Sequence, residues 1–179
     1  MGIINFFKNV KKEINNIKRQ NAYIQMNTEE MAGLNDEELF QAVGVRIESK
    51  IHKKYTMEEG LITLNEYEKA FYSTYYLETE VNNGGLCQYF VNSSRATAPY
   101  VSEGLTLIGA ERHRKAFDDF VKHNNIDVTD LSSFIIKDVK EFEEQEKRYP
   151  FDEYDHAFYE MESIESCLIP FVRENLSML

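Results

Sequence analysis

Apolar side chains recur at intervals of three or four residues along most of this chain, and that spacing constrains its fold more than any other feature. In residues 35–54 the apolar positions are Leu39, Phe40, Val43, Ile47 and Ile51. Such spacing predicts amphipathic helices, whereas the alternation of apolar and polar residues that is typical of strands is nearly absent. The 179 residues include only 3 Pro and 8 Gly, too few for the many turns of a β-sandwich or barrel. We therefore expect an all-α fold.

Helix caps and helix breakers set the expected boundaries. Besides residues 35–54, they predict helices over residues 64–83, 86–92, 100–108, 110–124 and about 130–148, and a last helix that follows the segment 151–159 and ends near residue 175. Gly84 and Gly85 are expected to end the helix over residues 64–83, and Pro170 to kink the last helix. We expect a single-domain multi-helix bundle over residues 35–179, preceded by an N-terminal amphipathic helix and a linker in residues 1–34.

The first 20 residues carry a narrow apolar seam on a basic segment. The seam consists of Ile3, Phe7, Val10, Ile14 and Ile17, and the charged residues around it sum to +4. This pattern predicts an amphipathic helix. The helix could dock on its own domain or on a second copy of the chain, or it could lie on a membrane surface. A seam of two residues in seven is narrow for lipid insertion, so docking is favoured over membrane contact through residues 1–20.

A buried polar cluster is predicted around Gly84 and Gly85. On a helical wheel, Glu78 and Asn82 fall on an aromatic face, where a carboxylate is costly unless it is hydrogen-bonded. The chain reverses after the glycines, and the first amides of the helix that starts at Leu86 lack partners. We expect Glu78, or Glu80 if the helix is rotated, to accept these amides. The whole cluster comprises Glu78, Glu80, Asn82, Asn83, Gly84, Gly85, Gln88, Tyr89 and Asn92.

The same cluster has the composition of an active site. Acid–base catalysis would need its carboxylates and Tyr89 to converge on a pocket. However, the cluster holds no evident nucleophile beside a base, and Cys87 has no His in its segment. We therefore expect a structural role for these residues, with no catalytic residue and no cofactor.

The cysteines and histidines give weaker signals. Cys87 and Cys167 form no metal or disulfide pattern and are expected to be free thiols in a reducing cytoplasm. The Glu-x-x-His spacing of di-iron helix bundles occurs once, at residues 153–156, and such a site needs a second copy, so no metal is expected. The remaining histidines are isolated and expected at the surface; they are His52, His113 and His123.

Negative charge accumulates toward the C-terminus. The net charge is −11, and residues 135–179 contribute −7 of it, with 12 acidic and 5 basic side chains. A surface of this sign repels nucleic acid and acidic lipid, which disfavours direct DNA or RNA binding and permits a basic protein partner. An ordinary solvated helix face would have the same composition. The expected interaction face consists of Asp138, Glu141, Glu143, Glu144, Glu146, Asp152, Glu153 and Asp155.

One stretch of the chain resembles a known family. It reads Glu80-Val81-Asn82-Asn83-Gly84-Gly85-Leu86-Cys87-Gln88-Tyr89-Phe90-Val91-Asn92, follows an aromatic helix and precedes Leu107-Ile108-Gly109-Ala110. Through this motif the chain resembles the bacterial DNA-mimic protein family. The resemblance extends from about residue 60 to the end of the chain. The resemblance implies an all-helical protein, often a homodimer, without known catalysis. It also implies an acidic surface that can occupy the DNA-binding face of a transcriptional regulator.

Three functions are therefore expected, in decreasing order. The first is protein–protein interaction, in which the acidic helical face engages a basic partner such as a DNA-binding regulator. The second is an inhibitor or immunity-type protein that blocks a basic enzyme through the same face. The third is an enzyme that uses the double-glycine cluster.

Overall fold

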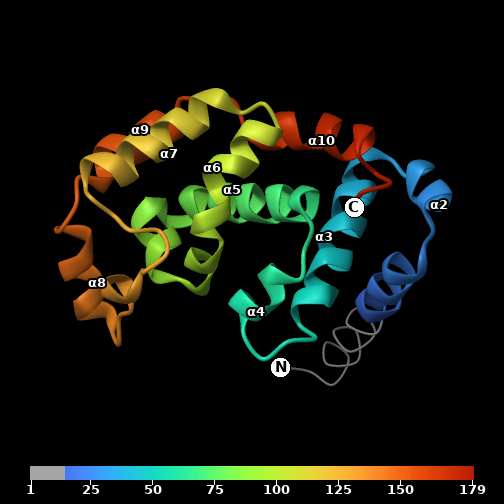
Figure 1. The fold of residues 1–179 in the computed structure, drawn as a ribbon, viewed down its shortest axis with the longest axis horizontal. Coiled ribbons are helices and arrows are strands. Elements are labelled where there is room, and N and C mark those ends of the chain that lie inside the picture. The colour runs from blue at the N-terminus through green and yellow to red at the C-terminus, as the bar shows by residue number, and fades with distance from the viewer. Residues whose placement is uncertain (1–14) are drawn as a thin grey trace, which may run out of the picture.

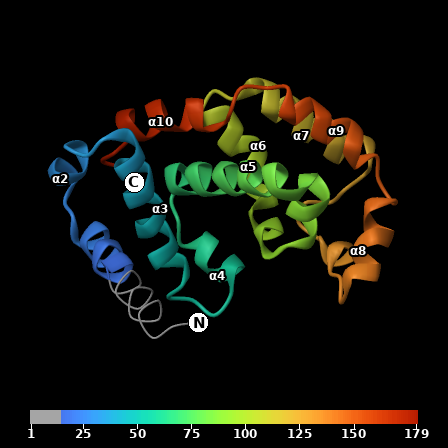
Figure 2. The ribbon, with the colours of Figure 1, turned by 180° about the vertical axis from the view of Figure 1, so that it is seen from behind.

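Every element of the described chain is helical, as the sequence predicts. The protein is seen in a computed structural model that describes residues 15–179, and no strand occurs in that range. In chain order the elements are α2 (Thr28–Ala32), α3 (Asp36–Ile51), α4 (Met57–Ile62), α5 (Glu66–Val91), the 3-10 helix η1 (Ser93–Thr97), α6 (Ala98–Leu107), α7 (Glu111–His123), the 3-10 helix η2 (Ser132–Phe134), α8 (Val139–Glu146), α9 (Phe151–Tyr159) and α10 (Glu165–Glu174). They form an arch with α5 at its centre, α2, α3 and α4 towards one end and α7, α8 and α9 towards the other (Figure 1, Figure 2).

The central helix α5 packs against most of the other elements. At its start, the Asn65 side chain accepts the Glu68 amide and the Glu68 carboxylate accepts the Asn65 amide, which closes a capping box. Glu68 is buried and also forms an ion pair with Lys50 of α3. The elements that contact α5 most extensively are η1, α6 and α9. The hydrophobic core therefore surrounds α5, with Tyr72 and Phe90 among its fully buried side chains.

Gly84 and Gly85 divide α5 into two helical segments. Both glycines have non-helical dihedral angles, and Gly85 has a φ of 76°, in the left-handed region. The Oδ1 atom of Asp155, in α9, accepts the amide of Leu86 at 2.7 Å. A Cβ atom on Gly85 would collide with the same carboxylate group. The predicted interruption at the double glycine is confirmed, and a residue of α9 holds the start of the second segment.

Residues 20–34, expected to be a linker, are largely helical. Residues 15–25 form a helix, and α2 follows it after the N-cap Asn27. Tyr23 and Met31 are buried in the same hydrophobic core as α3 and α5. The seam residues at positions 3, 7, 10 and 14 lie outside the described residues, and Ile17 is exposed.

The predicted helix over residues 35–54 is confirmed as α3, with Asn35 as its N-cap, whereas the helix expected over residues 130–148 is wrong in its first half. There, Asp127 Oδ1 accepts the amide and the hydroxyl of Thr129 at 2.9 and 2.7 Å. Asp138 then caps α8 by accepting the Glu141 amide at 3.0 Å. Side-chain acceptors therefore replace helical hydrogen bonds before residue 139.

The C-terminal prediction is confirmed in outline. The segment 151–159 forms α9, and the last helix, α10, ends at Glu174 and contains Pro170. The short helix α4 has no counterpart among the sequence predictions. Within residues 15–179, none of the helices combines the length and the apolarity that crossing a bilayer requires.

Replacing Gly85 by Ala tests the double-glycine interruption. The new Cβ would occupy a left-handed backbone position and would meet the Asp155 carboxylate, so we expect the free energy of unfolding in urea to fall by more than about 2 kcal/mol. Gly109→Ala is the matched control, because Gly109 has a φ of 79° but no atom within 4 Å of an added Cβ. Its free energy of unfolding should fall by only about 1 kcal/mol, the cost of placing a residue with a Cβ atom in the left-handed conformation. Equal losses in the two variants would contradict the role of the Asp155 contact.

Candidate functional site

The double-glycine cluster contains a carboxylate that is fully engaged by internal donors. Glu80 accepts hydrogen bonds from Gln88 Nε2 at 2.7 Å, Asn92 Nδ2 at 2.9 Å and Ser94 Oγ at 2.9 Å. Glu80, Gln88 and Asn92 are therefore brought together, as the sequence indicates. Ser94 was missed, and its only sequence signal is that it follows the helix end at Asn92. Asn83 is exposed and lies outside this network.

Tyr89 of the cluster and the neighbouring thiol of Cys87 are buried. The hydroxyl of Tyr89 lies 2.8 Å from the hydroxyl of Thr97, and burial raises the pKa of Tyr89. Burial also raises the pKa of the Cys87 thiol to about 12, helped by the negative charges of Glu146 and Asp155. Cys87 therefore stays protonated at neutral pH. Structural hydrogen bonds occupy the polar groups on which an acid–base site would depend.

Glu78 points away from this network, toward the start of α10. Its carboxylate accepts the Ile164 amide at 2.6 Å and the Glu165 amide at 3.1 Å. The expectation that Glu78 or Glu80 accepts the Leu86 amide is wrong, because Asp155 does so. Free amides at a helix start attract a carboxylate by hydrogen bonding and by the helix dipole, and here Glu78 serves α10 instead of its own chain reversal.

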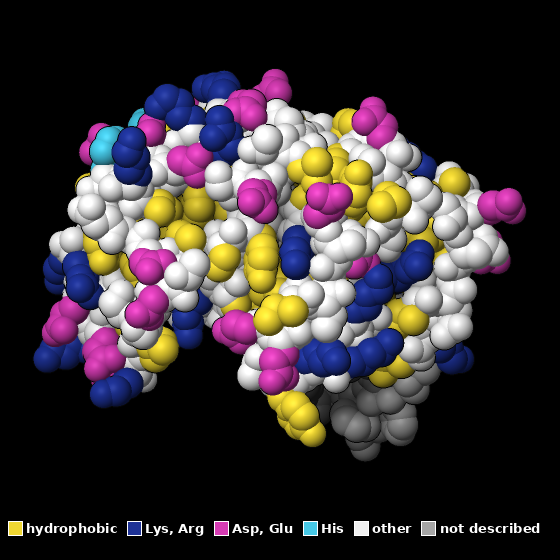
Figure 3. All heavy atoms as spheres, in the orientation of Figure 1, with side chains coloured by type: hydrophobic (Ala, Val, Ile, Leu, Met, Phe, Trp, Pro, Cys, Tyr) yellow, Lys and Arg dark blue, Asp and Glu magenta, His cyan; other side chains and the backbone are white. Residues whose placement is uncertain are grey.

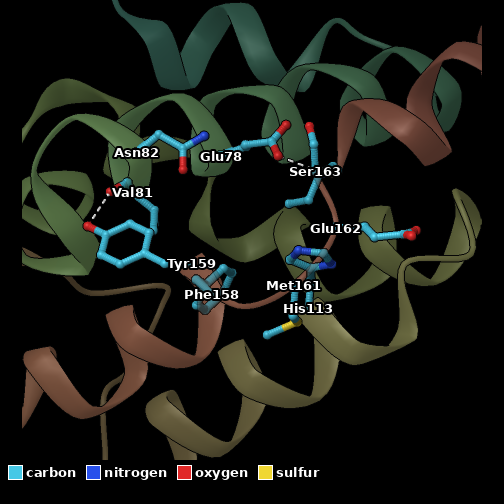
Figure 4. A pocket seen from close by; sticks show the side chains of 10 residues that line it. Glu78, Val81, Asn82, His113, Phe158, Tyr159, Met161, Glu162 and Ser163 are labelled. Carbon is cyan, nitrogen blue, oxygen red and sulfur yellow. Dashed lines mark hydrogen bonds between the residues drawn. The ribbon is translucent and has the colours of Figure 1, made fainter.

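A cavity of about 180 Å³ opens beside Glu78, where α5, α7, α9 and the α9–α10 connection meet (Figure 4). Its exposed lining residues are Asn82, Tyr159, Glu162 and Ser163, whereas Val81, His113, Phe158 and Ile164 are buried. The hydroxyl of Tyr159 donates to the carbonyl oxygen of Val81 at 2.9 Å, which ties α9 to α5 along one wall. The cavity therefore has a polar mouth and a partly apolar floor.

His113 is the least expected residue of this cavity. The isolated histidine was predicted at the surface, but its side chain is only 7% exposed and its ring lies 5.7 Å from that of Phe158. Neither ring nitrogen has a hydrogen-bond partner among residues 15–179, and both remain accessible from the cavity. Burial lowers the pKa of His113, and the neighbouring charge of Arg112 lowers it further. A neutral imidazole, with one free acceptor nitrogen, therefore faces the cavity.

The acidic residues of α8 lie beside basic ones, Lys140 within the helix and Lys137, Lys147 and Arg148 at its two ends. Asp138 caps its own helix, Glu141 accepts the Lys137 amide at 2.7 Å, and Glu144 lies 3.8 Å from Lys140. Within α8, the exposed acids that have no Lys or Arg within 4.0 Å in the described chain are Glu143 and Glu146. In the view of Figure 3, acidic and basic side chains alternate over the α8 arm of the molecule, so α8 presents a mixed surface.

The acidic residues of α9 are divided by burial. Asp152 and Glu153, in its first turn, are exposed. Asp155, predicted on the interaction face, turns inward instead: it is half-buried against Gly85 and Leu86, and this burial raises the pKa of its carboxyl group. No local pattern distinguished Asp155, because its acceptor role depends on a helix 69 residues earlier in the chain.

Comparison with known proteins gives a match to one family. A family model described as DMP19-like protein matches residues 62–175, which span α5 to the end of α10 and therefore include the double-glycine cluster and the cavity. No curated protein and no solved structure matches the chain.

Substituting Glu80 by Gln tests the internal network. The new side chain keeps one acceptor oxygen but replaces the other by an NH2 donor, and the charge that strengthens all three bonds is lost, so we expect the free energy of unfolding to fall by about 1 kcal/mol, which lowers the melting temperature by about 2–4 °C. Glu103→Gln is the control, since Glu103 is exposed and makes no hydrogen bond in the described chain. An unchanged melting temperature in Glu80→Gln would show that the network does not stabilise the fold.

Acid should weaken the fold through His113. Its folded pKa lies below the ordinary value of about 6.5, so the unfolded chain takes up the proton first, and stability is lost as pH falls through that value. Between pH 7.5 and pH 5 the native chain should lose more unfolding free energy in urea than His113→Gln does. Parallel pH profiles would mean that the ring is hydrated in the folded protein.

Proposed function

Because this chain belongs to the DMP19-like family, we propose that it is an acidic protein-interaction module that takes the place of DNA on a basic, nucleic-acid-binding partner. Membership supports a protein of the DNA-mimic type, in agreement with the resemblance found in the sequence. The partner would be a DNA-binding regulator, and the chain itself would not bind nucleic acid, since its net charge is −11.

The observation that carries this proposal is the charge of the α9–α10 region. Residues 149–172 include six acidic side chains and no Lys or Arg. Five of the six are exposed, namely Asp152, Glu153, Glu160, Glu162 and Glu165. Glu160 lies 3.2 Å from His156, and no Lys or Arg in the described chain lies within 4.0 Å of the other four. We therefore propose a contact surface on α9 and the start of α10, which keeps Asp152 and Glu153 of the expected face and leaves out the mixed α8 helix.

This surface can imitate duplex DNA only coarsely. DNA presents one charge for about every 1.7 Å of its axis, whereas an α-helix rises about 1.5 Å per residue and carries an acid at a fraction of its positions. The attraction would be mainly long-range, and exposed charges are screened over about 8 Å at physiological ionic strength. Binding to a basic partner should therefore weaken steeply as salt is added.

Variants in which acidic side chains are replaced by their uncharged amides test which surface binds the partner. Affinity capture at low salt from cells that make the protein would compare the native chain with Asp152→Asn/Glu153→Gln/Glu160→Gln/Glu165→Gln. We expect this variant to retain less than about a tenth of the basic partner, because four charges that steer and hold it are lost. Adding salt, or an excess of duplex DNA, should release the partner from the native chain.

Two further variants serve as controls, and the first removes the same number of charges as the α9–α10 variant. Glu58→Gln/Glu66→Gln/Glu103→Gln/Glu174→Gln removes four exposed acids elsewhere, two of them also in first helical turns. Glu143→Gln/Glu144→Gln/Glu146→Gln neutralises α8. If either control lost the partner as fully as the α9–α10 variant, the proposed surface would be wrong. Capture of a basic enzyme, instead of a nucleic-acid-binding protein, would indicate an inhibitor and reject DNA mimicry.

A further inference from the structure

The cavity beside Glu78 lies within the acidic α9–α10 region and is open to a partner. Glu162 and Ser163, in the connection between these two helices, line its mouth, and the Glu162 carboxylate is directed outward, away from Glu78 and His113 (Figure 4). The lining includes two carboxylates, Glu78 and Glu162, and no Lys or Arg. These two carboxylates outnumber the one neighbouring cation, Arg112, so a cationic group would be attracted here.

The floor of the cavity supplies an acceptor with no partner of its own. His113 is only 7% exposed, and neither of its ring nitrogens makes a hydrogen bond within residues 15–179. Its nitrogens are not among the fully buried, unbonded polar atoms of the described chain, so they are open to the cavity, and a ligand there can donate to one of them. Because the ring is neutral, it can accept a hydrogen bond from a cation without repelling it.

The hydrogen-bond acceptors around the cavity belong to different helices and to different chemical groups. The Glu78 carboxylate comes from α5 and keeps lone pairs beyond the two amides that it accepts. The imidazole of His113 comes from α7, and the Asn82 side chain adds an amide oxygen at the mouth. Only a guanidinium group offers five N–H donors in one plane, which suits several acceptors on separate elements better than the single ammonium of Lys.

We propose that this cavity receives the side chain of an arginine from the basic partner, with the guanidinium group between Glu78 and His113. The aromatic rings of Phe158 and Tyr159 line the same space and suit the planar cation. A cavity of about 180 Å³ is large enough, since one of about 150 Å³ holds benzene. This inference rests on the proposed function and adds a specific anchor to an otherwise long-range attraction.

The test uses the full chain and a capped arginine, N-acetyl-arginine methylamide, as the probe. Titration would be followed by NMR through the methyl group of Met161, which lines the cavity, and through the ring signals of His113. We expect saturable shifts of both, and a further fall in the pKa of His113 when the cation is bound. The capped citrulline analogue, which has the same shape and no charge, should bind at least about tenfold more weakly.

Variants separate the anchor from the surface. Glu162→Gln should weaken the arginine probe several-fold without unfolding, because Glu162 is exposed and makes no bond in the described chain, whereas Glu103→Gln should leave binding unchanged. Equal affinity for arginine and citrulline, or no saturable shift, would overturn the anchor even if partner capture still depended on Asp152, Glu153, Glu160 and Glu165. The opposite result is also possible. If the arginine probe binds but the α9–α10 charge variant still captures the partner, the anchor is supported and the proposed acidic surface is rejected.

Discussion

Backbone amides that no helix can satisfy by itself are the constraint on which this structure depends. Two of the helical starts, at Leu86 and at Ile164, are bonded by carboxylates that lie 69 and 86 residues away in the chain. Asp155 reaches back from α9 to the second segment of α5, and Glu78 reaches forward from α5 to α10. Each bond removes an unsatisfied donor and also fixes the position of one helix against another. The C-terminal helices are thus joined to α5 by polar contacts as well as by apolar packing.

The cavity is a consequence of the Glu78 contact and of a second bond between α9 and α5. Glu78 holds the start of α10 near α5, and the bond from Tyr159 to Val81 holds the end of α9 beside it. The chain between these two points crosses the mouth of the cavity, and α7 closes it from below with His113. A carboxylate that completes a helix start therefore also faces a space large enough for a ligand, so stability and recognition share one residue.

Local chemistry explains which predictions from sequence succeeded. Asn35 followed by three acids predicted α3, and the glycine pair predicted the interruption of α5, because caps and breakers act within a few residues of their own position. The helix expected over residues 130–148 failed because Asp127 and Asp138 compete locally for amides. Asp155 and His113 could not be placed, since nothing in their own segments separates an inward acid from an exposed one, or a buried ring from a surface ring.

Because Gly85 and Asp155 are in contact, a substitution at one of these positions changes which residues the other can accept. While the carboxylate occupies the space above residue 85, natural variation there is closed to every residue larger than glycine. Loss of the carboxylate would open that space but would leave an amide unbonded, so neither change is easily accepted alone. A chain of this family that lacks one member of the pair is therefore a sign that α9 meets α5 in a different way.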